Sequence, residues 1–89
     1  MTNIDVRTQE EWNEGHIEGA LHVPVEDIIN EKIGPIRNLA KEEELQIYCK
    51  TGNRSGIAMS ILAAMGYNNT ENMGGIDRMV SLGYNEVKE

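Results

Sequence analysis

The sequence is short of several features that each mark a class of protein. Its 89 residues contain a single cysteine, so no disulfide can form within the chain. No apolar run approaches the roughly 20 residues that a membrane span needs. Basic residues number 8 against 15 acidic ones, which gives a formal net charge of −7. This balance disfavours nucleic acids and anionic membranes as partners, and a small anionic ligand would need a local positive pocket.

The chain is also too short to hold two cores. A sequence of 89 residues buries one hydrophobic core, so we expect a single domain over residues 1–89. Met1, Thr2 and Asn3 lead directly into a predicted strand, and no signal peptide is recognised, although a removed signal would leave the same sequence.

Short strands and helices are predicted to alternate along the chain. The predicted strands are residues 4–6, 20–23, 45–48 and 70–73, and the predicted helices are residues 9–14, 25–33, 55–65 and 76–82. Thr8 and Glu11 have the capping-box spacing at the start of the first helix, and Gly66 is expected as a left-handed C-cap of the third. The alternation predicts an α/β fold, with a central parallel sheet of about four short strands and helices on both faces.

The lone cysteine, Cys49, ends the third predicted strand and precedes a polar loop that enters a helix near Ser55. The loop consists of Lys50, Thr51, Gly52, Asn53 and Arg54. A lone cysteine is either a small buried residue or a reactive thiol. Ligands bind parallel sheets at the carboxyl ends of strands, and here the loop N–H groups can stabilise a thiolate. Because Gly52 permits a tight loop and Lys50 and Arg54 add positive charge, the surroundings favour the reactive thiol.

The spacing between the cysteine and the arginine separates two kinds of chemistry. Cysteine phosphatases place five residues between them, in a backbone cradle wide enough for phosphate. Only four residues separate Cys49 from Arg54, and this shorter loop predicts a tighter cup that suits one sulfur atom. The segment from Cys49 to Ser55 resembles the active-site loop of single-domain rhodaneses, which are sulfurtransferases that carry a persulfide on cysteine.

Two further stretches extend the resemblance from Ile4 to Gly75. They comprise Ile4-Asp5-Val6-Arg7, Trp12, His16-Ile17-Glu18-Gly19-Ala20 and Val23-Pro24, and then Glu71-Asn72-Met73-Gly74-Gly75. The chain particularly resembles small bacterial rhodaneses of the phage-shock-protein-E kind, many of which are exported. The resemblance therefore implies the periplasm if a signal peptide has been removed, and otherwise the cytoplasm. Ile76 and Met79 depart from the tryptophan common in the family after the paired glycines, and Glu18 stands where proline is common.

The resemblance implies a role for each residue of the loop. Cys49 would be the catalytic nucleophile that accepts sulfur, and the N–H groups of residues 50–54 would hold the persulfide anion. The substrate-binding residues would be Lys50, Thr51, Gly52, Asn53 and Arg54. Lys50 would attract the anionic donor or be an ordinary solvated lysine. Arg54 would either contact the substrate or fix the loop through a carboxylate, for which Asp5 is a candidate. The Thr51 hydroxyl could donate a hydrogen bond to sulfur.

Other polar residues are expected to support the site. Asp5 and Arg7 would tie the end of the first strand to neighbouring loops, while Ser55 would bond the sulfur or cap the helix. His16 lies in a tight turn and is expected to be structural, and His22 has no ligand partner at metal-binding spacing. We therefore expect no metal and no other cofactor.

The family resemblance implies a thiosulfate sulfurtransferase. Its partners would be thiosulfate as the small anionic donor and cyanide or a thiol as the acceptor. One alternative is a sulfur-carrier or redox-signalling module that receives persulfide from a protein partner. Another, which the short loop disfavours, is a cysteine phosphatase or arsenate reductase. The implied strand order is second, first, third, fourth, and the exposed edge of the fourth strand predicts a monomer with some tendency to self-associate.

Overall fold

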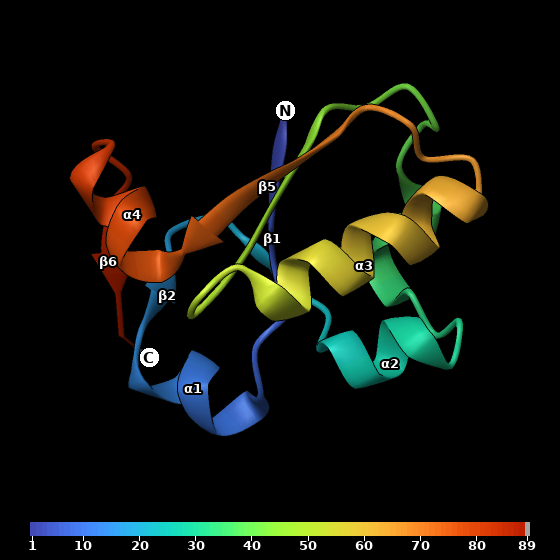
Figure 1. The fold of residues 1–89 in the computed structure, drawn as a ribbon. Coiled ribbons are helices and arrows are strands. Elements are labelled where there is room, and N and C mark those ends of the chain that lie inside the picture. The colour runs from blue at the N-terminus through green and yellow to red at the C-terminus, as the bar shows by residue number, and fades with distance from the viewer. Residues whose placement is uncertain (89) are drawn as a thin grey trace.

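The computed structural model describes residues 1–88 and contains the predicted parallel sheet (Figure 1). The strands of this sheet are β1 (Thr2–Asp5), β3 (Leu21–His22), β4 (Leu45–Cys49) and β5 (Thr70–Gly75). They run in the order β3-β1-β4-β5, and each neighbouring pair is parallel. The predicted fold class and strand order are confirmed. Because the order reverses direction between β1 and β4, Cys49 ends its strand where such sheets bind ligands.

Helices cover both faces of the sheet. They are α1 (Gln9–Glu14), α2 (Val25–Ile29), α3 (Asn53–Ala64) and α4 (Ile76–Ser81), with a 3₁₀ helix η1 (Gly34–Asn38). Figure 1 shows α2 and α3 on one side of the sheet and α4 on the other. Successive residues of β4 point to opposite faces, so Ile47 and Cys49 join the core beneath α2 and α3 while Tyr48 packs in a second cluster with Met79 of α4.

Local sequence signals set several element boundaries as predicted. Thr8 and Glu11 form a capping box at the start of α1, and Gly66 follows α3 in a left-handed conformation with φ of 100°. The helix predicted over residues 25–33 was too long. The α2 helix ends at Ile29, because the chain turns through Glu31 at φ 61° before entering η1. The α3 helix begins two residues before its predicted start at 55.

Two features of the fold were not predicted. A second sheet joins β2 (His16–Ile17) to β6 (Glu86–Val87) in antiparallel pairing. In addition, four large apolar residues within the predicted helix ranges are exposed: Ile29, Ile57, Val80 and Leu82. Ile29, Ile57 and Val80 belong to helices that bury only one side against the sheet, and Leu82 follows the end of α4, so these positions point to solvent. No helix within residues 1–88 has the length and hydropathy that a bilayer crossing requires.

Candidate active site

The thiol of Cys49 lies at the focus of the loop that joins β4 to α3. Cys49 is the last residue of β4 and is fully buried. The backbone N–H of Gly52 donates a hydrogen bond to its Sγ at 2.9 Å. The Ser55 hydroxyl, in the first turn of α3, lies 3.5 Å from the same sulfur. The loop therefore curls around the sulfur and directs hydrogen-bond donors toward it.

These donors change the ionisation of the thiol. Burial acts to raise the pKa of Cys49, but hydrogen bonds from the Ser55 side chain and from the N–H groups of Ser55, Gly52 and Thr51 outweigh it. The net result is a pKa below the ordinary value for a cysteine thiol. Because the thiolate is the nucleophilic form of cysteine, this arrangement favours attack by the sulfur at neutral pH.

Two glycines permit the loop to adopt this shape. Gly52 has a φ of 96°, in the left-handed region that side chains disfavour. Gly75, at the end of β5, lies against the backbone of Lys50, and a Cβ atom there would overlap the Lys50 carbonyl oxygen. The paired glycines at the end of β5 thus allow a strand and the loop to approach closely. The side chain of Lys50 itself is exposed at the loop surface.

Asn72 of β5 clamps the loop and was not singled out from the sequence. Its Nδ2 donates to the carbonyl of Gly52 at 2.9 Å, and its Oδ1 lies 2.6 Å from the Ser55 Oγ, where it is a second acceptor for the one hydroxyl proton that can also be directed to Sγ. The N–H of Gly74 also donates to this oxygen at 2.9 Å. The contact spans 20 residues of sequence, so spacing alone could not reveal it. A polar residue beside the paired glycines, at the carboxyl end of the strand next to Cys49, was the available signal.

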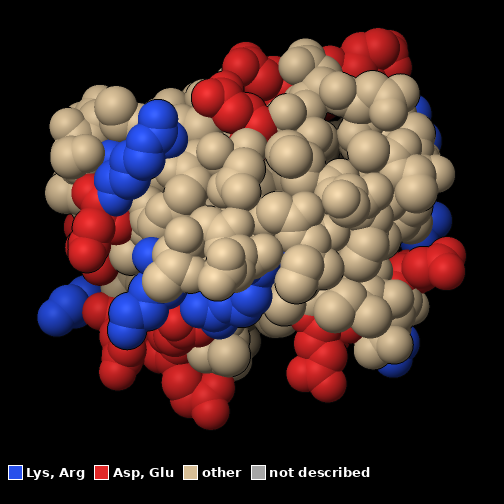
Figure 2. Space-filling view, in the orientation of Figure 1, with Lys and Arg blue, Asp and Glu red and all other residues tan. Residues whose placement is uncertain are grey.

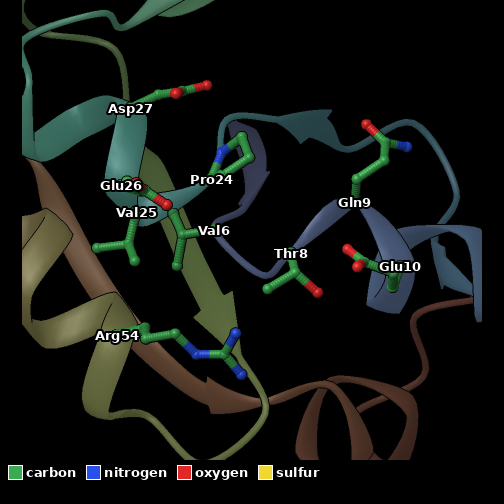
Figure 3. A pocket seen from close by; sticks show the side chains of 9 residues that line it. All are labelled: Val6, Thr8, Gln9, Glu10, Pro24, Val25, Glu26, Asp27 and Arg54. Carbon is green, nitrogen blue, oxygen red and sulfur yellow. The ribbon is translucent and has the colours of Figure 1, made fainter.

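Arg54 pairs with a carboxylate other than the predicted one. Its Nη1 and Nη2 donate to the two oxygens of Glu11 at 2.6 and 3.0 Å, whereas Asp5 was the candidate named from the sequence. The hydrogen bond from Arg54 is the main cause that lowers the pKa of Glu11 to about 2. Figure 3 shows the Arg54 guanidinium directed toward α1 across a hollow of about 320 Å³. Since Glu11 also closes the capping box with Thr8, one carboxylate joins α1 to the loop.

Asp5 instead forms an ion pair with Arg7. Both side chains are buried, and the Arg7 Nε and Nη2 donate to the carboxylate of Asp5 at 3.1 and 2.8 Å. Burial acts to lower the pKa of Arg7, but the hydrogen bonds to Asp5 outweigh it and the net shift is upward. The Arg7 guanidinium also lies 5.8 Å from the ring centroid of Tyr48. This pair fixes the turn after β1 beside the end of β4.

The histidines lie in a ring stack. Trp12 stacks on His16 at 3.5 Å and on His22 at 4.7 Å between ring centroids. The Nδ1 of His16 lies 3.1 Å from the Trp12 carbonyl oxygen, and the Nε2 of His22 lies 2.8 Å from that of Arg7. Both rings therefore hold the backbone around α1. Within residues 1–88 no group of three or more histidine, cysteine, aspartate and glutamate side chains is placed to bind a metal.

Comparison with known proteins identifies the family. Residues 2–81 match the model of the rhodanese-like domain, and the chain belongs to this family. It is 34% identical over 73 residues to thiosulfate sulfurtransferase PspE of Escherichia coli, covering 82% of this chain and 68% of that protein. Thiosulfate sulfurtransferase 18 of Arabidopsis thaliana is 33% identical over 82 residues, covering 81% of this chain and 60% of that protein.

A solved structure shows the same architecture. The structure of a rhodanese with anions from E. coli superimposes with a TM-score of 0.83 at 33% sequence identity. The match covers 99% of this chain and 98% of that one. The resemblance drawn from the loop and its flanking motifs is therefore confirmed at the level of family and fold.

Proposed function

We propose that the protein is a thiosulfate sulfurtransferase that works through a persulfide on Cys49. In the first half-reaction the Cys49 thiolate attacks the outer sulfur of thiosulfate. The bond between the two sulfur atoms of thiosulfate breaks, and its electron pair leaves with sulfite. The observation that carries the proposal is the convergence of N–H and hydroxyl donors on Sγ, because these groups stabilise first the thiolate and then the persulfide anion. The sulfurtransferase relatives support the same chemistry.

The second half-reaction returns the enzyme to its starting state. A thiolate or cyanide attacks the outer sulfur of the persulfide, the bond to Sγ breaks, and its electron pair remains on Cys49 as the thiolate. The products are an acceptor persulfide or thiocyanate. No metal or cofactor takes part in either step as proposed. The protein would act as a monomer, and a periplasmic location stays a prediction.

Each residue of the loop has a proposed role in this cycle. The N–H groups of Thr51 and Gly52 face the sulfur, while the exposed Lys50 attracts the anionic donor. Asn53 begins α3 at the end of the loop, and we assign it to substrate binding. Arg54 fixes the loop through Glu11, since its guanidinium is already bidentate to that carboxylate.

Intact-mass spectrometry tests the proposal directly. Thiosulfate should add one sulfur atom to the wild-type protein, cyanide should remove it, and the variant Cys49→Ser should show neither change. If the wild type gains no sulfur at any thiosulfate concentration, transfer from thiosulfate is wrong, and loading from a protein persulfide donor becomes the better hypothesis. Hydrolysis of an aryl phosphate or reduction of arsenate well above background would overturn the argument from loop length.

A further inference from the structure

A second polar hollow adjoins the loop on the side of β5 and α4. Its volume is about 370 Å³. It is lined by Thr51, Gly52 and Asn53 of the loop and by Asn72, Met73, Gly74 and Arg78. The Nη1 of Arg78 donates to the carbonyl of Met73 at 2.8 Å, which fixes the side chain beside the end of β5. The guanidinium is thus held in place at the edge of the hollow, with further N–H donors available.

The charge at this hollow differs from that of the rest of the molecule. Three other hollows each have carboxylates in their lining. These are Glu10, Glu26 and Asp27 in the hollow beside Arg54, Glu42 in the hollow beside Gly66, and Glu11, Glu14, Asp77 and Glu86 in the hollow beside Lys50. The hollow at Arg78 has no carboxylate in its lining. No ion pair joins Arg78 to an acidic residue within residues 1–88. In a chain of net charge −7, this hollow is therefore suited to an anion.

The hollow lies close to the Cys49 sulfur, and Gly52 separates the two. Gly52 lines the hollow and donates its N–H to Sγ at 2.9 Å, but Cys49 is not in the lining. A charged group bound at Arg78 would lie near the reacting sulfur without touching it. Thiosulfate fits this separation poorly, because its charged oxygens are only two bonds from the sulfur that is attacked. A thiol that carries a carboxylate on a short carbon chain does fit it.

We propose that the hollow at Arg78 binds the carboxylate of a small anionic thiol that serves as the sulfur acceptor. This inference rests on the proposed function. The acceptor thiolate attacks the outer sulfur of the Cys49 persulfide, and the acceptor leaves as its persulfide while Cys49 keeps the electron pair. Arg78 is thereby a specificity residue for the second half-reaction. Figure 2 shows basic side chains among acidic ones at the side of this face where the loop and α4 lie, whereas the centre of the face is largely uncharged.

The two half-reactions allow a selective test. The persulfide is first formed with thiosulfate, excess reagent is removed, and its decay is followed with 3-mercaptopropionate or with the neutral thiol 3-mercapto-1-propanol. Arg78→Ala should slow the reaction of 3-mercaptopropionate about three- to tenfold, the loss of one charged hydrogen bond at a partly exposed site. The same substitution should leave the rate with the neutral thiol and the rate of persulfide formation from thiosulfate within about twofold of the wild-type rates. Arg78→Lys should retain part of the preference for 3-mercaptopropionate over the neutral thiol.

Arg37→Ala is the matched control, because Arg37 is also an exposed arginine but lies in η1, away from the hollow. Equal effects of Arg78→Ala on the two thiols, no effect on either, or an equal effect of Arg37→Ala would overturn the inference. If no persulfide forms at all, the proposed function fails, and the hollow is then tested by binding alone. In NMR spectra of Cys49→Ser, 3-mercaptopropionate should shift the amide resonances of Gly52 and Gly74. Adding Arg78→Ala should abolish these shifts. Resonances that do not move in Cys49→Ser would refute the binding site, whatever the outcome for the proposed function.

Discussion

Replacing Glu11 with glutamine should measure how strongly α1 holds the active-site loop. Glutamine can still accept the capping hydrogen bond from Thr8, so the substitution removes the charge and leaves the cap. The pKa of Glu11 falls from 4.5 to about 2 in the folded protein, which corresponds to about 3 kcal/mol of stability before solvent screening. The side chains of Arg54 and Glu11 are 30% and 22% exposed, so solvent screens the ion pair. We therefore expect Glu11→Gln to lower the free energy of unfolding by about 1.5 kcal/mol.

The contribution of this ion pair should depend on pH in a defined direction. A carboxylate with a lowered folded-state pKa stabilises the fold fully above its unfolded-state pKa, and loses this effect as the pH falls toward about 2. Less than half of the contribution of Glu11 should remain at about pH 3. The stability difference between wild type and Glu11→Gln should therefore shrink by more than half between pH 7 and pH 3.

Urea unfolding at the two pH values provides the measurement, and the melting temperature at pH 7 should fall by about 6 to 12 °C. Glu10→Gln is the control, because it removes the same charge from the same helical turn without touching Arg54. A stability difference of equal size at pH 7 and pH 3 would refute the assignment to the ion pair. An equal loss in Glu10→Gln would instead assign the effect to the charge at the start of α1.

Two further substitutions test the loop itself. Gly75→Ala should push the loop away through the carbonyl of Lys50 and reduce sulfurtransferase turnover about a hundredfold, whereas turnover within twofold of wild type would mean that the close approach is dispensable. Ser55→Ala should move the pH midpoint of Cys49 alkylation by iodoacetamide upward, because the Ser55 side chain lowers the pKa of the thiol. Ser60→Ala, at an exposed position of the same helix, is the control and should leave the midpoint unchanged. A midpoint that is unchanged or lower in Ser55→Ala would contradict the role given to the Ser55 hydroxyl.

The features of the fold that depend on local sequence were predictable. The capping box at Thr8 and the glycine after α3 reflect short-range backbone requirements, and both are present as expected. The strand order was available only through the family resemblance, because periodicity does not specify which strands pair. The sheet formed by β2 and β6 was missed because each strand has two residues, too few to show any alternation.

The site was predictable where it depends on the loop and not where it depends on contacts across the fold. Cys49 at the end of a buried strand follows from the pattern of residues 45–49. The identity of the carboxylate that pairs with Arg54 does not follow from the sequence, because several carboxylates near the start of the chain were available, Asp5 and Glu11 among them. Arg7, two residues after Asp5, already occupies that carboxylate through two side-chain nitrogens, which leaves Glu11 for Arg54. Sequence spacing gives no measure of this competition.

The ion pairs around the loop also explain how an acidic chain can hold an anionic sulfur. Arg7 and Arg54 are each matched by a carboxylate, so neither adds an uncompensated positive charge near Sγ. The thiolate is held mainly by oriented neutral donors, the N–H groups of the loop and the Ser55 hydroxyl, whose positions are fixed by folding. Lys50 and Arg78 make no ion pair within residues 1–88, and both border hollows next to the loop. Neutral dipoles therefore lower the pKa of the Cys49 thiol, while Arg78, whose hollow has no carboxylate in its lining, is the cation that we propose to bind the anionic acceptor.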